Sequence, residues 1–183
     1  MRFWGIVGLV AVLFALTGFS PAGAHGNVDQ MNDGCSASPT SAGNIEVFAP
    51  MGQSFKATVS KLFGVDLYLE DGSADGEGTT IRVTIREGTI DGSVVGETTS
   101  VVRDGTTDWW HFDFHKKPKL TPGATYVIQL SVDTNPPNPV SHQFLAAMTG
   151  SFLNPDPYLD GTRIEKGVPV SGDLCFRTYT NGK

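Results

Sequence analysis

The sequence predicts an all-β domain in which two antiparallel sheets stack as a β-sandwich. Polar and apolar residues alternate with a period of two in successive short segments. Turn-forming residues separate those segments, with 22 Gly and 11 Pro among 183 residues, and the 39% hydrophobic content is enough for one packed core. A period of two buries one side of each strand and leaves the other in water, as antiparallel sheets do.

Six segments carry this alternation clearly: residues 53–59, 63–70, 79–87, 109–115, 126–132 and 174–179. Weaker strands are expected near 45–48, 97–103 and 141–147. The predicted inward residues are, in chain order, Phe55, Ala57 and Val59; Phe63, Val65, Leu67 and Leu69; Ile81, Val83 and Ile85; Trp110, Phe112 and Phe114; Tyr126, Ile128, Leu130 and Val132; and Leu174 and Phe176.

Turn signals between the strands favour a jelly-roll over an immunoglobulin-type sandwich. They include the Asp- and Gly-rich loop 71–78, the tight turn 90–92 and the turn 120–123. The stretch 133–173 is less regular and contains two proline-rich runs, so we expect surface loops there, where binding sites often lie.

The first 24 residues are typical of an export signal. Arg2 precedes an apolar run over 3–19, and small residues at Ala22 and Ala24 suit signal peptidase. A retained membrane anchor is the alternative, since the run is long enough to span a bilayer. Cleavage after Ala24 leaves a single domain at 25–183 with 12 − 19 = −7 formal charges, which disfavours a nucleic-acid partner. We therefore expect a secreted protein, extracellular or periplasmic, with no transmembrane segment after cleavage.

Two cysteines, Cys35 and Cys175, are the only ones in the chain. In an exported protein they most simply form one disulfide, which would close a loop of about 140 residues. Two buried free thiols, or thiols used on a partner, are the alternatives.

Several segments together resemble exported bacterial and archaeal β-sandwich domains. They are residues 52–55, 65–69, 81–89, 112–114, 120–128 and 173–179, which read GQSF, VDLYL, IRVTIREGT, FDF, LTPGATYVI and DLCFRTY. The resemblance covers nearly the whole mature chain, although the group commonly has Ala where this chain has Cys175. It implies a jelly-roll domain similar to galactose-binding-like and carbohydrate-binding modules.

The outward side of the segment 109–115 is the first candidate site. Trp109, His111, Asp113 and His115 share one side over roughly 20 Å. An indole stacks on the C–H face of a sugar ring, and Asp, His or Arg bond its hydroxyls. If their strands are neighbours, Tyr68, Asp66, Arg82 and Arg86 would add to this surface. An ordinary solvated sheet face gives the same polar pattern. Tyr158 and Asp160 offer a second sugar-binding possibility in the irregular loop.

Three carboxylates, Asp71, Asp75 and Glu77, lie within seven residues and make calcium the candidate cofactor. The alternative is a solvated hairpin loop, because Asp and Gly suit turns for local reasons. Asp29 and Asp173 form a second candidate calcium pair if the disulfide joins the chain ends.

A minor alternative is a copper-dependent polysaccharide monooxygenase. Cleavage after Ala24 would leave His25 as the N-terminus, whose amine and imidazole suit copper together with His111, His115 or His142. The chain carries no serine-hydrolase elbow, zinc-protease helix motif, phosphate loop or dinucleotide fingerprint. We therefore expect a non-enzymatic binding module for carbohydrate or a cell-surface polymer. The competing expectation is a structural or adhesive envelope protein with no glycan ligand.

Overall fold

The computed structural model describes residues 26–34, 41–71, 76, 78–133, 144–149 and 158–181. These residues form thirteen strands in two antiparallel sheets, and no α-helix occurs among them. The prediction of an antiparallel β-sandwich is confirmed.

The first sheet, called the β4 sheet, has seven strands. They are β1 (Val28–Asn32), β2 (Ser41–Asn44), β4 (Gly64–Asp71), β7 (Thr107–Asp113), β9 (Phe144–Thr149), β12 (Asp173–Leu174) and β13 (Phe176–Tyr179). Strand β4 is central, since it pairs with β7, β9 and β13.

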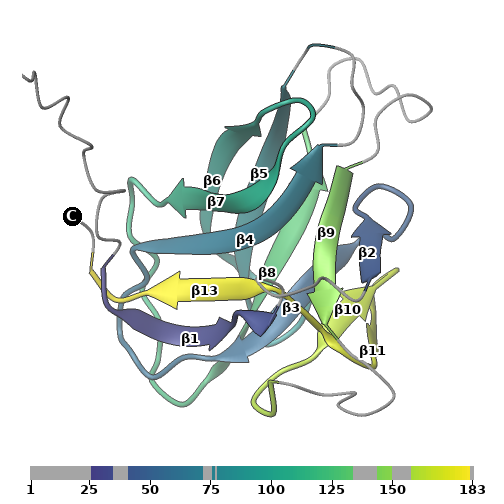
Figure 1. Ribbon diagram of the computed structural model, residues 1–183. Coiled ribbons are helices and arrows are strands. Elements are labelled where there is room, and N and C mark those ends of the chain that lie inside the picture. The colour runs from purple at the N-terminus through teal and green to yellow at the C-terminus, as the bar shows by residue number, and fades with distance from the viewer. Residues whose placement is uncertain are drawn as a thin grey trace, which may run out of the picture.

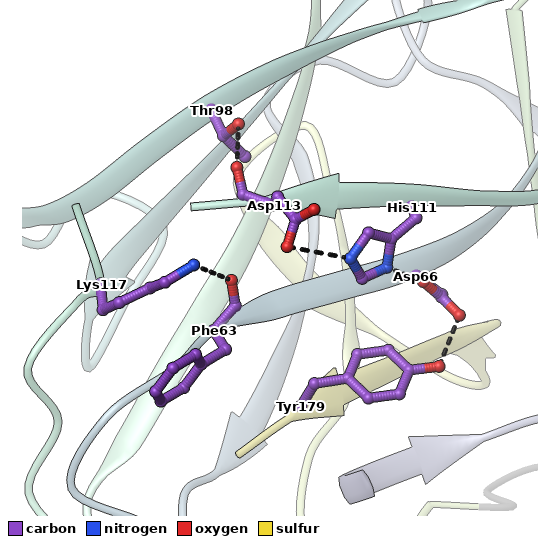
Figure 2. A network of polar contacts seen from close by, with 7 residues as sticks. All are labelled: Phe63, Asp66, Thr98, His111, Asp113, Lys117 and Tyr179. Carbon is purple, nitrogen blue, oxygen red and sulfur yellow. Dashed lines mark hydrogen bonds and ion pairs between the residues drawn. The ribbon is translucent and has the colours of Figure 1, made fainter. Parts of the chain in front are cut away.

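The second sheet, called the β8 sheet, has the order β11-β10-β3-β8-β5-β6. Its strands are β3 (Met51–Lys56), β5 (Thr79–Glu87), β6 (Val94–Val102), β8 (Thr125–Val132), β10 (Arg163–Glu165) and β11 (Val168–Val170). In Figure 1 the strands β4, β7 and β13 lie in front of β8. At one edge the two sheets are joined by a hydrogen bond of 2.7 Å from the Thr98 hydroxyl to the Asp113 carbonyl (Figure 2).

The core between the sheets is built mainly from the side chains that the alternation points inward. Val59 and Phe63, also predicted inward, are only partly buried, and Leu62 is buried instead of Phe63. Ile81, Val83 and Ile85 are at most 1% exposed, and four phenylalanines, at 55, 112, 114 and 176, are fully buried. These residues belong to one hydrophobic cluster. Each such side chain stabilises the fold by about 1.5–3 kcal/mol through the area it removes from water.

The segment 45–48 was predicted as a strand and is instead a turn. The side chain of Asn44 explains the difference, because its Oδ1 accepts hydrogen bonds from the N–H groups of Glu46 and Val47 at 3.0 and 2.9 Å. An Asn that caps its own following backbone favours a turn over a strand. The strand lies just before it, at β2.

Candidate functional site on the outer face of the β4 sheet

The register of the β4 sheet brings the predicted residues of 109–115 beside those of 63–70. Tyr68 is opposite Trp109 and Asp66 is opposite His111 in the pairing of β4 with β7. On the other side of β4, Arg177 of β13 is opposite Asp66. Residues directly opposite in a ladder share one side of the sheet. We call this surface, made by Asp66, Tyr68, Trp109, His111, Asp113, Arg177 and Tyr179, the outer face.

Asp66 is the centre of the outer face and is only 2% exposed. Its Oδ1 lies 2.5 Å from His111 Nδ1, and its Oδ2 accepts a hydrogen bond of 2.5 Å from the Tyr179 hydroxyl. The Arg177 guanidinium lies 4.0 Å from Oδ2. A buried carboxylate is tolerated only when it is paired and hydrogen-bonded, as here. Figure 2 shows His111 and Tyr179 converging on Asp66.

His111 lies between two carboxylates. Its Nδ1 faces Asp66, and its Nε2 lies 3.2 Å from Asp113 Oδ1. The hydrogen bond to Asp66 raises the pKa of His111 above its ordinary value, with a further contribution from Asp113 and against the effect of burial. The arrangement therefore favours the imidazolium form, with both ring nitrogens donating.

Trp109 is half-buried and lies beneath a cation. The guanidinium carbon of Arg177 is 3.9 Å from the centroid of the indole, within the range of a cation–π interaction. Tyr68 meets the same indole edge-on, with 5.5 Å between ring centroids, and buried Cys175 packs against both rings. These contacts fix the orientation of the aromatic pair on the outer face.

Three of the predicted sugar-binding residues, Arg82, Arg86 and Tyr158, lie elsewhere. Arg82 is in the β8 sheet, where it forms ion pairs of 2.5 and 2.6 Å with Glu97 and Asp133 that raise its pKa. Tyr158 is only 8% exposed: its hydroxyl donates to Gln30 at 2.8 Å, its ring packs on Phe176, and burial raises its pKa to about 12. Neither side chain contributes to the outer face, since one belongs to the opposite sheet and the other to the core. Arg86 is also in the β8 sheet.

The candidate calcium residues are only partly described. Asp71 is fully buried at the end of β4, whereas Asp75 and Glu77 lie outside the described residues. Asp29 accepts hydrogen bonds from Thr58, and Asp173 accepts from Gln53 at 2.8 Å and from the Tyr158 N–H at 3.1 Å. Within the described part of the chain, no three His, Cys, Asp or Glu residues are grouped as metal ligands. Calcium stays a prediction.

The predictions that depend on Cys35, His25 and His142 also fall on residues outside the description, as does the export signal. Cys175 is described and is 1% exposed. Of the other candidate copper ligands, His111 lies between Asp66 and Asp113 on the outer face, and His115 is exposed just beyond β7. The disulfide and the copper site therefore stay predictions.

Arg177 and Tyr179 are the members of the outer face that sequence reasoning missed as functional residues. The alternation in 174–179 does place both outward. Their neighbour was unknown, because a period of two assigns a side chain to one side of a sheet and gives no information on which strand lies next to it. Only the structure shows that β13 lies beside β4.

Comparisons with protein-family models and with curated protein sequences give no match. Among the described residues, no helix has the length and apolar character needed to cross a membrane. The candidate site is therefore argued from its own chemistry.

Proposed function

We propose that this protein is a secreted, non-catalytic binding module and that the outer face binds carbohydrate or another cell-surface polymer. The observation that carries the proposal is the aromatic pair Tyr68–Trp109, set beside Arg177, His111 and Asp113 on one side of a sheet. The galactose-binding-like, jelly-roll assignment belongs to the same proposal and rests on the sequence resemblance.

The chemistry of the outer face suits a polyhydroxylated ligand. Indole and phenol rings supply apolar surface for the C–H side of a sugar ring, and neighbouring charged groups accept or donate to its hydroxyls. The side chain of Asp113 is 63% exposed and lies at the rim of the outer face. The Asp66 network holds these groups in one arrangement, which lowers the entropic cost of binding.

The same network argues against acid–base catalysis at His111. A general base needs a nitrogen lone pair within reach of the substrate. Here Nδ1 and Nε2 both face carboxylates, so the imidazole is held as a structural donor. This geometry supports the proposal of binding without chemistry at His111.

A pull-down of the full mature chain on a panel of insoluble polysaccharides tests the proposal. We expect Trp109→Ala to weaken retention roughly tenfold or more, because truncating a central aromatic anchor costs about 2 kcal/mol or more. Trp109→Phe keeps a ring and should retain most binding. Leu159→Ala, at a side chain that is 85% exposed, is the matched control and should bind normally. Retention on no polymer, or equal retention of Trp109→Ala, would contradict the proposal.

The second candidate is a structural or adhesive envelope protein without a glycan ligand. One observation favours it: Arg177 already covers a side of the Trp109 indole, so part of the stacking surface is occupied within the molecule. The polysaccharide panel separates the two functions, since this candidate gives no retention for any variant.

A further inference from the structure

A cavity of about 360 Å³ opens on the outer side of the β8 sheet, on the opposite layer from Trp109. Its lining comes from the turn after β5 (Gly88 to Asp91), from Ser54 and Thr125 of β3 and β8, and from the segment around β10 and β11. A volume of this order is the lower end of the range for small-molecule sites.

The floor of the cavity is apolar. Ile90 and Ile164 line it and belong to a small hydrophobic cluster apart from the main core, in which they cover Val127. Each of the three is at most 5% exposed. Val127 and Ile164 are in the β8 sheet, and Ile90 reaches over Gly52 of β3, where a Cβ would lie only 3.1 Å from the Ile90 Cδ1. The absence of a side chain at Gly52 thus lets the turn close one side of the cavity.

The walls are fixed by hydrogen bonds between the segments that line the cavity. The Thr162 N–H donates to the Ser54 hydroxyl at 2.8 Å, and the Thr162 hydroxyl donates to the Val170 carbonyl at 2.8 Å. The Gly88 N–H donates to the Thr125 carbonyl at 3.0 Å and ties the turn to β8. The cavity is therefore formed before a ligand arrives.

The polar groups at the mouth are two hydroxyls, of Thr89 and Thr125, and the carboxylate of Asp91. All three residues are exposed, and within the described part of the chain no hydrogen bond engages their side chains. Hydroxyls donate and accept, and a carboxylate accepts. No Lys, Arg or His is among the described residues that line the cavity, and Asp91 is the charged residue of that lining.

We propose that this cavity is a second binding site, which takes one neutral, hydroxyl-rich ring of the size of a monosaccharide unit. The apolar floor packs against the C–H face of the ring, and Thr89, Thr125 and Asp91 bond its hydroxyls. The inference does not depend on the outer face of the β4 sheet, because the two sites are in different sheets.

Titration of the ¹⁵N-labelled full mature chain with neutral methyl glycosides, followed by amide NMR, tests the inference. We expect saturable shifts at Gly88, Thr89 and Thr125 with a Kd of about millimolar, as is usual for a ligand of about a dozen heavy atoms. The corresponding uronic acids should bind about tenfold more weakly, because the carboxylate of Asp91 repels them. Shifts centred on Trp109 would instead indicate binding at the outer face. The experiment therefore tests the two sites independently.

Two substitutions complete the test. Thr125→Trp fills the cavity and should abolish the shifts, whereas Thr99→Trp, at an exposed position on edge strand β6, should leave them unchanged. If Thr125→Trp does not fold by circular dichroism, Asp91→Asn takes its place, with an expected severalfold loss of affinity for neutral rings. Absence of saturation with every neutral glycoside overturns the inference. So does preferential binding of uronates or amines, or binding that survives both Thr125→Trp and Asp91→Asn.

Discussion

Asp66 lies on the side of the β4 sheet where a carboxylate is ordinarily hydrated, yet three other side chains exclude water from it. His111, Tyr179 and Arg177 converge on its two oxygens from strands on either side of β4. The network makes this part of the outer face rigid, and it fixes the orientation of the imidazole. The first prediction at this scale concerns His111.

The stability contributed by His111 should depend on pH. A histidine whose pKa is raised on folding stabilises the fold fully below its unfolded pKa of about 6.5, and the contribution is lost as the pH rises through the folded pKa. The folded pKa of His111 is raised, chiefly by its hydrogen bond to Asp66. His111→Gln should therefore lower the free energy of unfolding more at about pH 5.5 than at about pH 8.5.

Urea unfolding at the two pH values measures this difference. His115→Gln, at an exposed histidine of the same segment, is the matched control and should leave the pH dependence of stability close to that of the wild type. An equal loss at both pH values for His111→Gln would mean that the imidazolium–carboxylate pair does not stabilise the fold.

The composition of the candidate site was predictable from the sequence only in part. The period of two identifies Trp109, His111 and Asp113 as one surface. It cannot identify Arg177, which is over 60 positions from Trp109 in the chain and reaches its indole across β4. Nor can it exclude Arg82, which belongs to the other sheet. Tyr158 follows a proline-rich run that suggested an exposed loop, but its ring fills a gap against Phe176.

At the scale of elements, alternation predicts strands well where each strand has one buried and one wet side. The segment 79–87 coincides with β5, and its inward residues are buried as expected. Alternation gives the wrong burial for a residue on the outer side of a strand where other side chains cover that side. Val127 was expected outward and in water, but it is fully buried because Ile90 and Ile164 pack over it. Such local covering depends on turns and neighbouring strands, which a period of two does not encode.

A buried polar link between β3 and β12 gives the prediction at this scale. Gln53 is fully buried; its Nε2 donates to Asp173 Oδ1 at 2.8 Å, and its Oε1 accepts from the Leu174 N–H at 2.8 Å. This side chain crosses from the β8 sheet to the β4 sheet. Gln53→Leu keeps a side chain of similar volume but removes one hydrogen-bond partner from the buried carboxyl group of Asp173 and one from the buried N–H of Leu174. We therefore expect the free energy of unfolding to fall by about 2–4 kcal/mol.

Thermal or urea unfolding measures that loss, and Gln129→Leu serves as its control. Gln129 is half-buried on the outer side of the β8 sheet, where its Oε1 accepts from Arg86 at 2.5 Å. Its loss should cost about 1 kcal/mol or less, since water replaces the partner. Equal destabilisation by the two substitutions would show that the buried link between the sheets contributes no more to stability than the half-buried hydrogen bond of Gln129.

At the scale of the whole molecule, the two ends of the described chain lie side by side. Strand β1 pairs with β13, Val28 is opposite Tyr179, and the Thr180 N–H donates to the Asn27 carbonyl at 2.9 Å. Figure 1 shows β1 and β13 adjacent along one margin of the β4 sheet. Closing the sheet therefore requires contacts between residues about 150 positions apart, and such long-range pairing costs much chain entropy.

The last prediction is that a Cys35–Cys175 disulfide offsets this cost. Asn32 is opposite Phe176, and its side chain donates to the Leu174 carbonyl at 2.9 Å, so β1 ends beside Cys175 with Cys35 three positions further along. We expect peptide mapping without reduction to recover the two cysteines in one cross-linked species. Reduction should lower the free energy of unfolding by about 2–5 kcal/mol, because the loop released is about 140 residues long. A Cys35→Ala/Cys175→Ala double variant provides the control, since a reductant should leave its stability unchanged. Two thiols that react with a thiol reagent in the unreduced, unfolded protein would contradict the prediction, and the stability of the β1–β13 pair would then rest on packing and hydrogen bonds alone.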